Sequence, residues 1–250
     1  MDARYAAAYP RLYRQHWWWR VREAILVQKI RALLRDVREP RILDVGCGAA
    51  LFFDVLEPLA HVEGIESDRG AVERAGRWRG RIAVGELDGG YRPAEAFDLI
   101  LMLDVLEHVE DPEPLLRRAA AVLKPGGRLL ITVPAFTWLW TAHDELNHHV
   151  RRYAARDLRA AIEAAGLAPI EMRFLFQSLV VPKLLTRMKE AVSGSRPRVP
   201  AIPPRAVNAL IQAFFLAEHA IAGWLPFGGS LMAIAGRCDH HGDEIVDSHV

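Results

Sequence analysis

Short apolar segments alternate with longer amphipathic segments between residues 41 and 165 of the 250-residue chain. We expect the short segments to be strands, and they cover residues 41–45, 61–66, 81–85, 97–103 and 128–133. The segments between and after them predict helices over residues 49–59, 68–78, 112–123 and 156–165. Strands and helices that alternate in this way are typical of an α/β protein with a doubly wound parallel sheet, covered by helices on both faces.

The two ends of the chain depart from this alternation. Residues 14–38 predict one long amphipathic helix. Residues 168–176 and 229–237 predict two further strands, and a proline-rich linker and an apolar helix (206–225) lie between them. The expected division of the chain is an N-terminal helical lid (1–40), a main domain (41–176 and 229–238), a helical insertion (177–228) and a flexible tail (239–250).

Charge and cysteine content limit the partners and the compartment. The 32 Lys and Arg residues nearly balance the 31 Asp and Glu residues, so the net charge is +1. A nearly neutral chain is not a general polyanion binder, and we expect no nucleic-acid partner. Two cysteines cannot form a disulfide framework, the first 13 residues lack the apolar core of a signal peptide, and no stretch of about 20 residues is free of polar groups. We therefore expect a cytoplasmic protein, with membrane association through its surface as the alternative.

A glycine-containing loop follows the first expected strand directly, where residues 44–48 read DVGCG. Glycines at this point let the backbone turn tightly and approach a ligand closely. Glu66 ends the next expected strand, about 20 residues beyond the loop, where a carboxylate can accept both hydroxyls of an adenosine ribose. A dinucleotide fingerprint would need a third glycine where Leu51 stands. The loop therefore favours an adenosine-type ligand without a pyrophosphate, such as S-adenosylmethionine.

These motifs, in this order, resemble those of class I S-adenosylmethionine-dependent methyltransferases. The matching segments are residues 42–48, 64–66, 97–100, 103–109 and 123–127. The resemblance implies a Rossmann-like, seven-stranded and mostly parallel sheet whose last strand is antiparallel, with S-adenosyl-L-methionine as the cofactor. The chain also resembles a bacterial subgroup of these enzymes, which carries His-Trp-Trp-x-Arg near its start (16–20 here) and His-Asp-Glu with His-x-Arg-Arg-Tyr further on (143–145 and 149–153 here).

The resemblance also implies a set of cofactor contacts. Asp44 and the two loop glycines would line the methionine part of the cofactor, Glu66 would hold the ribose, and Glu86 would lie near the adenine. The residues expected to bind the cofactor are Arg20 (with Arg22 as the alternative), Asp44, Gly46, Cys47, Gly48, Glu66, Ser67, Glu86, Leu87, Asp104 and Val105. Ala50 stands where the family usually has a third glycine, a departure that could shift the start of the next helix and weaken cofactor binding.

Methyl transfer to an oxygen atom calls for a base, and His is the natural base near neutral pH. His108 and His143 follow expected strands at the ligand-binding edge of the sheet, and His148 is a further candidate. His143 is favoured because its segment also carries Asp144, His148, His149 and Arg151. The segment with Asp104, Glu107 and His108 resembles a metal-binding segment of some quinone O-methyltransferases. We favour the interpretation that these side chains only orient the site, and we predict no metal.

The apolar helix expected over 206–225 carries one apolar stripe, which Glu218 and His219 interrupt. Two ionisable groups make a membrane-spanning helix costly, so the stripe predicts packing on the domain, on a second subunit or on a bilayer surface. The three adjacent tryptophans at 17–19 cannot all face one core, so at least one should face a pocket, a partner or lipid.

We therefore predict an S-adenosylmethionine-dependent methyltransferase that acts on oxygen of a small or lipid-linked acceptor. Arg151 and Arg152 would either bind a phosphate or carboxylate or form the solvated start of a helix. The expected partners are this acceptor, a peripheral membrane contact and a second copy of the chain. The alternative function is a cofactor-binding protein without methyl transfer activity, regulatory or structural, which only Ala50 suggests.

Overall fold

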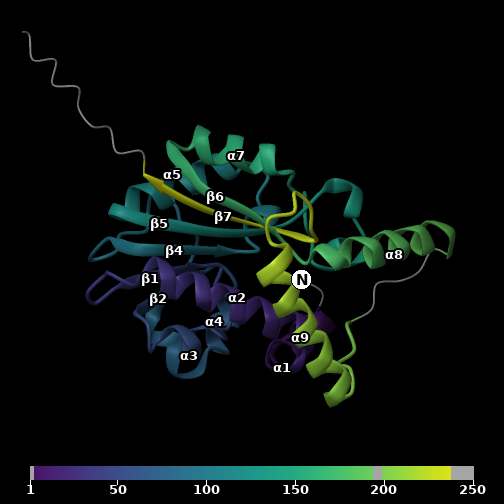
Figure 1. Cartoon of the computed structure of the whole chain (residues 1–250). Coiled ribbons are helices and arrows are strands. Elements are labelled where there is room, and N and C mark those ends of the chain that lie inside the picture. The colour runs from purple at the N-terminus through teal and green to yellow at the C-terminus, as the bar shows by residue number, and fades with distance from the viewer. Residues whose placement is uncertain (1–2, 194–198, 238–250) are drawn as a thin grey trace, which may run out of the picture.

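The computed structural model describes residues 3–193 and 199–237. Its strands form one seven-stranded sheet (Figure 1). Its strands are β1 (Arg41–Val45), β2 (His61–Glu66), β3 (Ile82–Val84), β4 (Phe97–Leu103), β5 (Leu123–Pro134), β6 (Leu167–Leu175) and β7 (Ser230–Arg237). They lie in the order β3-β2-β1-β4-β5-β7-β6. Neighbours from β3 to β5 are parallel, whereas β7 runs antiparallel to both β5 and β6. The predicted mostly parallel sheet with an antiparallel last strand is confirmed.

Helices cover both faces of this sheet (Figure 1). Those on one face are α5 (Pro112–Val122) and α7 (Ala155–Ala164), and those on the other are α2 (Trp17–Leu33), α3 (Phe53–Leu56) and α4 (Arg69–Glu73). Each face has its own apolar core: Leu116 and Leu158 are fully buried in the first, and Ile30 and Phe53 in the second. The remaining helices are α1 (Ala3–Gln15), α6 (Ala142–Leu146), α8 (Val180–Ser193) and α9 (Arg205–Ala222).

The single helix predicted over 14–38 is wrong, because the structure has two helices, α1 and α2, that meet at His16. His16 has an extended backbone (φ −78°, ψ 136°), and its side chain caps the start of α2. Asn208 of α9 satisfies backbone groups on both sides of the break. Its Oδ1 accepts from the Trp17 amide at 2.9 Å, and its Nδ2 donates to the Gln15 carbonyl at 2.8 Å. A side chain distant in sequence therefore stabilises the break.

Two other predicted helices are much shorter in the structure. Of the helix predicted over 49–59, only α3 forms, and Ala50 has a left-handed backbone (φ +54°) that a continuing α-helix cannot contain. Of the helix predicted over 68–78, α4 ends at Glu73, and a 3₁₀ turn follows from Gly76 to Arg81. The left-handed backbone of Gly76 (φ +58°) accounts for this change of path.

The three adjacent tryptophans of α2 face different neighbours, as their spacing predicts. Trp19 is buried, whereas Trp17 stacks on Phe215 (ring centroids 4.8 Å apart) and Trp18 stacks on Phe176 (5.7 Å). Phe215 belongs to α9, and Phe176 follows β6. These contacts fix the N-terminal helices against the C-terminal part of the chain.

The segment between β6 and β7 carries two helices, not the one predicted. The apolar helix expected over 206–225 is α9, which lies beside α2 in Figure 1, while α8 extends away from the end of the sheet. No helix within the described residues is both long and apolar enough to cross a membrane. The division into lid, main domain and insertion stays a prediction, and the expected tail (239–250) lies outside the described residues.

Candidate active site

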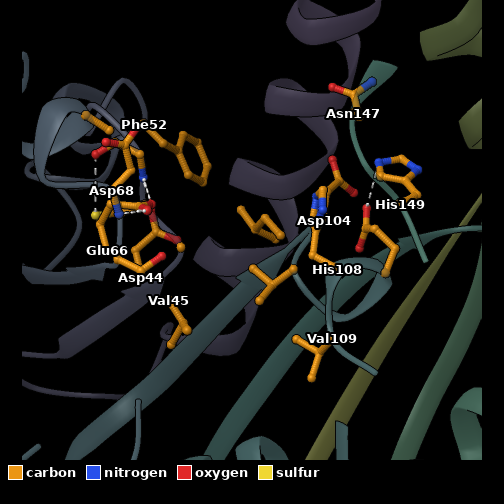
Figure 2. A pocket seen from close by; sticks show the side chains of 18 of the residues that line it. Asp44, Val45, Phe52, Glu66, Asp68, Asp104, His108, Val109, Asn147 and His149 are labelled. Carbon is orange, nitrogen blue, oxygen red and sulfur yellow. Dashed lines mark hydrogen bonds and ion pairs between the residues drawn. The ribbon is translucent and has the colours of Figure 1, made fainter. Parts of the chain in front are cut away.

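A cavity of about 1600 Å³ opens where the carboxyl ends of β1, β2 and β4 meet α1 and α2. Figure 2 shows two groups of polar side chains in it. The first, here called the glycine-loop end, comprises the loop at 44–48 with Glu66, Ser67 and Asp68. The second, here called the histidine end, comprises Glu107, His108, His143, Asp144, Asn147, His149, Arg152 and Lys183. The cavity thus joins the loop expected to bind a cofactor to the segments expected to carry a base.

Backbone hydrogen bonds hold the glycine loop against β2. The Gly46 amide donates to the Ile65 carbonyl at 2.8 Å. Glu66 accepts from two backbone amides: Oε2 from Gly48 and Oε1 from Asp68, each at 2.8 Å. This carboxylate therefore joins the loop after β1 to the loop after β2, which fixes both at the mouth of the cavity.

Both loop glycines have conformations that other residues rarely adopt. Gly46 (φ +69°) approaches Val105 so closely that a Cβ on it would lie 3.0 Å from Cγ2 of that side chain. Gly48 (φ +56°) has open space where a Cβ would stand. The next left-handed residue is the buried Ala50, so a third glycine at this position would relieve backbone strain. Ala50, which replaces the usual third glycine, therefore lies at a position where the backbone is strained.

Asp44 at the end of β1 is a buried carboxyl group within the cavity wall. Burial, with Glu66 nearby, raises the pKa of Asp44 to about 7, although Arg22 acts in the opposite direction. A cationic ligand group beside Asp44 would favour the ionised form and so restore a lower pKa. The site is therefore suited to an ammonium group.

Arg22 and Asp104 both line the cavity and form an ion pair. Arg22 Nη2 lies 2.9 Å from Asp104 Oδ2 and 2.8 Å from Thr132 Oγ1, and that hydroxyl donates to Asp104 Oδ1 at 3.0 Å. Arg20 is exposed, does not line the cavity and pairs with Glu23. Of the two arginines considered for the cofactor carboxylate, Arg22 is the one that lines the cavity.

The other residues expected to bind the cofactor also line the cavity, and they are Cys47, Ser67, Glu86, Leu87 and Val105. Burial raises the pKa of the Cys47 thiol, so this cysteine is a neutral wall residue rather than a nucleophile. A Cβ on Gly64 would lie only 2.5 Å from the Cys47 sulfur, which shows how tightly the thiol is packed against β2.

At the histidine end, Asp144 is fully buried and accepts several hydrogen bonds. Arg152 binds it with two nitrogens, Nε to Oδ1 and Nη2 to Oδ2, each at 2.8 Å. The Thr141 amide donates to Oδ2 at 2.9 Å, which closes a capping box at the start of α6. His149 Nδ1 lies 2.9 Å from Oδ1. Although burial opposes ionisation, these donors hold the pKa of Asp144 well below its usual range. Arg152 is therefore a buried partner of Asp144, and the predicted solvated start of a helix is wrong for this residue.

His149 bridges Asp144 to a second buried acid. Its Nε2 lies 3.9 Å from Glu107 Oε1, and its ring lies edge-on to that of His108 with centroids 4.9 Å apart. Burial raises the pKa of Glu107, whose Oε2 has no hydrogen-bond partner. Ligand atoms of Glu107, His108 and His149 lie within 4.8 Å of one another, so these three side chains could hold a metal ion.

The three predicted bases lie in different surroundings. Burial lowers the pKa of His108. His143 is an exposed residue that lines the cavity, and desolvation by the surrounding protein, with Lys183 nearby, lowers its pKa to about 4. Its Nε2 also lies 3.1 Å from the side-chain nitrogen Nδ2 of Asn147. His148 is exposed, has a left-handed backbone (φ +57°) and does not line the cavity.

Sequence reasoning preferred His143 to its neighbour His149 and assigned no separate catalytic role to Asp144. Thr141 with Asp144 three positions later is a capping-box pattern, and it marks the start of a helix. The Val150 amide donates to the Glu107 carbonyl at 2.8 Å, and this long-range bond, which no local pattern shows, brings His149 beside the loop after β4.

The glycine loop after β1, the acid at the end of β2 and this strand order define a class of protein: the fold is that of class I S-adenosylmethionine-dependent methyltransferases. The profile of a family described as "Methyltransferase domain" matches residues 15–172. The chain belongs to this methyltransferase family.

Individual relatives agree with this assignment. A ubiquinone biosynthesis O-methyltransferase of Bradyrhizobium sp. (strain ORS 278) is 35% identical over 107 residues, which are 39% of this chain and 41% of the relative. The chain thus matches less than half the length of this curated relative. A SAM-dependent methyltransferase structure from Archaeoglobus fulgidus is 15% identical, covers 85% of this chain and 93% of its own, and has a TM-score of 0.53. The [4+2]-cyclase SpnF is 21% identical, covers 85% and 80%, and has a TM-score of 0.53. Since a cyclase has this fold, the fold alone does not specify the reaction.

S-adenosylmethionine is the cofactor of this family, and the glycine-loop end fits it. Each Glu66 oxygen accepts one backbone hydrogen bond and so keeps a lone pair for a ribose hydroxyl. Asp44 offers a buried carboxylate for the ammonium group, and the open side of Gly48 leaves the loop backbone accessible. These three residues would hold the cofactor.

Cofactor affinity should fall as the pH drops through about 7, because Asp44 must be ionised to pair with the ammonium group. Below that pH, protonated Asp44 must lose its proton on binding, so affinity should fall about tenfold per pH unit. Above it, affinity should be constant as long as the ammonium group remains charged. Isothermal titration calorimetry with S-adenosylmethionine between pH 5 and 7.5 measures this directly. Asp44→Asn should bind weakly with little pH dependence, and a flat wild-type profile would show that Asp44 does not pair with the cofactor.

Proposed function

We propose that the protein transfers a methyl group from S-adenosylmethionine to a hydroxyl oxygen of a small aromatic acceptor. The support for oxygen comes from the relatives, which are named ubiquinone biosynthesis O-methyltransferases and match part of the chain. The support for an aromatic acceptor comes from the cavity wall, where α1 contributes Tyr5, Tyr9 and Tyr13. Aromatic walls stack favourably on a flat ring. The bound cofactor supplies an electrophilic methyl group, and the protein must orient the acceptor and remove its proton.

The pairing of His149 with Asp144 is the observation that carries this proposal. A buried carboxylate that accepts from one imidazole nitrogen fixes the tautomer and leaves the other nitrogen unprotonated as a base. Here Asp144 lies 2.9 Å from Nδ1, and His149 lines the cavity. We therefore propose His149, rather than His143, as the general base. A His143 with a pKa of about 4 is a weak proton acceptor at neutral pH.

Lys183 of α8 is proposed to stabilise the oxygen anion that forms as the proton leaves. It lines the cavity and has no hydrogen bond or ion pair with any described residue. Burial, with Arg152 nearby, lowers its pKa to about 8. A lysine with this pKa is still largely cationic at pH 7, so it offers a positive charge near the acceptor.

A methyl transfer assay tests the proposed function. The purified protein would be incubated with S-adenosylmethionine carrying a labelled methyl group and with catechols, phenols, amines and thiols of similar size. We expect label on catechol or phenol oxygen only. Transfer to nitrogen, sulfur or carbon would contradict the proposal. Tight cofactor binding without transfer to any acceptor would favour a cofactor-binding protein without methyl transfer activity.

Peripheral membrane contact and homodimer formation stay predictions. Sedimentation with lipid vesicles tests the first, and sedimentation velocity of the purified chain tests the second. Exposed apolar side chains on α8 and α9, among them Leu185, Met188 and Ile221, are the surface that either contact would use.

A further inference from the structure

We propose that a second, smaller cavity binds a hydrocarbon tail of the acceptor, an inference that rests on the proposed function for the identity of the head group. This tail groove has a volume of about 600 Å³ and lies between α2, the start of α8 and α9. Its walls are Trp17, Ser178, Leu179, Pro182, Leu210, Ile211, Phe214 and Phe215. Its volume is within the range of ordinary ligand pockets.

The tail groove adjoins the candidate active site. Trp17 and Leu179 line both the groove and the large cavity. A molecule with its reactive head at the histidine end could therefore place an attached chain in the groove.

The chemistry of the groove fits a hydrocarbon chain. Every lining residue except Ser178 is apolar, and the Ser178 amide already donates to Glu218 Oε2 at 2.7 Å. The walls that the described residues form hold no charged side chain, so the gain on binding must come mainly from burial of apolar surface.

The groove is also preformed. Trp17 stacks on Phe215 with an interplanar angle of 10°. The buried Glu218 ties α9 to the segment before α8 through Ser178. On the outer wall, Leu210 and Phe214 are 72% and 52% exposed to solvent. A preformed apolar wall in contact with water binds a chain without the cost of ordering the protein first.

The size of the groove favours a ligand tail over a second copy of the chain. Eight residues line it, whereas a stable protein interface uses about 20 to 30 residues on each side. The groove also lies outside residues 15–172, the part that the methyltransferase profile matches, apart from Trp17. The tail site is thus contributed mainly by α8 and α9 rather than by the shared domain.

Quenching of tryptophan fluorescence by 12-bromododecanol tests the proposal without cofactor or turnover. Bromine quenches on contact, so binding in the groove should quench Trp17, and 3-bromopropanol should do so only at far higher concentration. Phe214→Asp places a charge in the groove and should weaken dodecanol binding by about tenfold or more. Ile221→Asp is the matched control, because Ile221 is a 74% exposed residue of the same helix outside the groove. Trp17→Phe should retain binding but lose most of the quenching.

Three outcomes would overturn the proposal. Equal losses in Phe214→Asp and Ile221→Asp would show that the alcohol binds the helix surface in general. No difference between the long and short alcohols would show that no tail site exists. If Phe214→Asp dissolves a dimer, or abolishes vesicle binding, without changing dodecanol affinity, a second copy or a bilayer occupies the groove. Methyl transfer measured on the same variants distinguishes failure of the tail site from failure of the proposed function. The protein can bind the long alcohol without transferring a methyl group, and it can transfer a methyl group without binding the long alcohol.

Discussion

His149→Gln should lower kcat by about 10²–10⁴-fold, because the variant keeps an amide that can reach Asp144 but lacks a nitrogen that can take up a proton. In the structure, Asp144 lies 2.9 Å from one nitrogen of His149, while the other nitrogen faces Glu107 within the cavity. Steady-state kinetics on the best hydroxyl acceptor gives the measurement. Cofactor affinity, measured by calorimetry, should stay the same because the glycine-loop end is unchanged.

Two controls distinguish a base from a merely structural residue. The fall in kcat at acid pH, which protonation of the base causes, should disappear in His149→Gln. His143→Gln should keep that fall and most of kcat, because protein surroundings already lower the pKa of His143 to about 4. If His143→Gln is the more damaging change, the assignment of the base is wrong. If a chelator abolishes wild-type activity and added divalent cation restores it, His149 acts as a metal ligand with Glu107 and His108 instead.

Arg152→Met should destabilise the protein by about 3–5 kcal/mol, the usual cost of leaving one partner of a buried ion pair uncompensated. Asp144 is fully buried, and Arg152 contributes two of its hydrogen bonds as well as its counter-charge. Without Arg152, the pKa of Asp144 must rise, and the loss of stability should be greatest at neutral and alkaline pH. Urea denaturation followed by circular dichroism gives the free energy of unfolding.

A double variant provides the matched control for this prediction. Asp144→Asn with Arg152→Met removes the charge and the counter-charge together, so it should recover part of the lost stability. Because Asp144 has a lowered pKa in the folded state, its ion pair contributes stability above pH 4, and this contribution fades as the pH falls through the folded-state pKa. A double variant that is less stable than Arg152→Met alone would contradict this account.

Sequence patterns predicted the sheet better than the helices. Strands β1, β2 and β4 have the predicted bounds, because each contains buried apolar residues that mark its position in the sequence. The helix ends differ because the decisive interactions are not periodic. The break at His16 is stabilised by Asn208, and the short α3 follows from the left-handed Ala50.

The two ends of the candidate site also differ in how well the sequence predicted them. The glycine loop, Asp44 and Glu66 form one local arrangement after β1 and β2, and a known motif was enough to bring them together. At the histidine end, sequence reasoning favoured His143 because its segment also carries Asp144, His148, His149 and Arg151. The choice between His143 and His149 depends on which imidazole meets the buried Asp144 carboxylate, and residue spacing alone does not show which of the two does so.

The position of β7 between β5 and β6 has a consequence for how the chain folds. β5 and β6 are completed long before β7 leaves the ribosome, yet they have no direct pairing with each other in the finished sheet. The hydrogen bonds that stabilise the α1–α2 junction likewise cannot form until Asn208, 191 residues beyond Trp17, has been synthesised. The cavity walls therefore remain incomplete during most of synthesis, and such long-range closure slows folding. A nascent chain in which the glycine loop has already been synthesised should therefore not bind the cofactor stably until β7 has been inserted between β5 and β6.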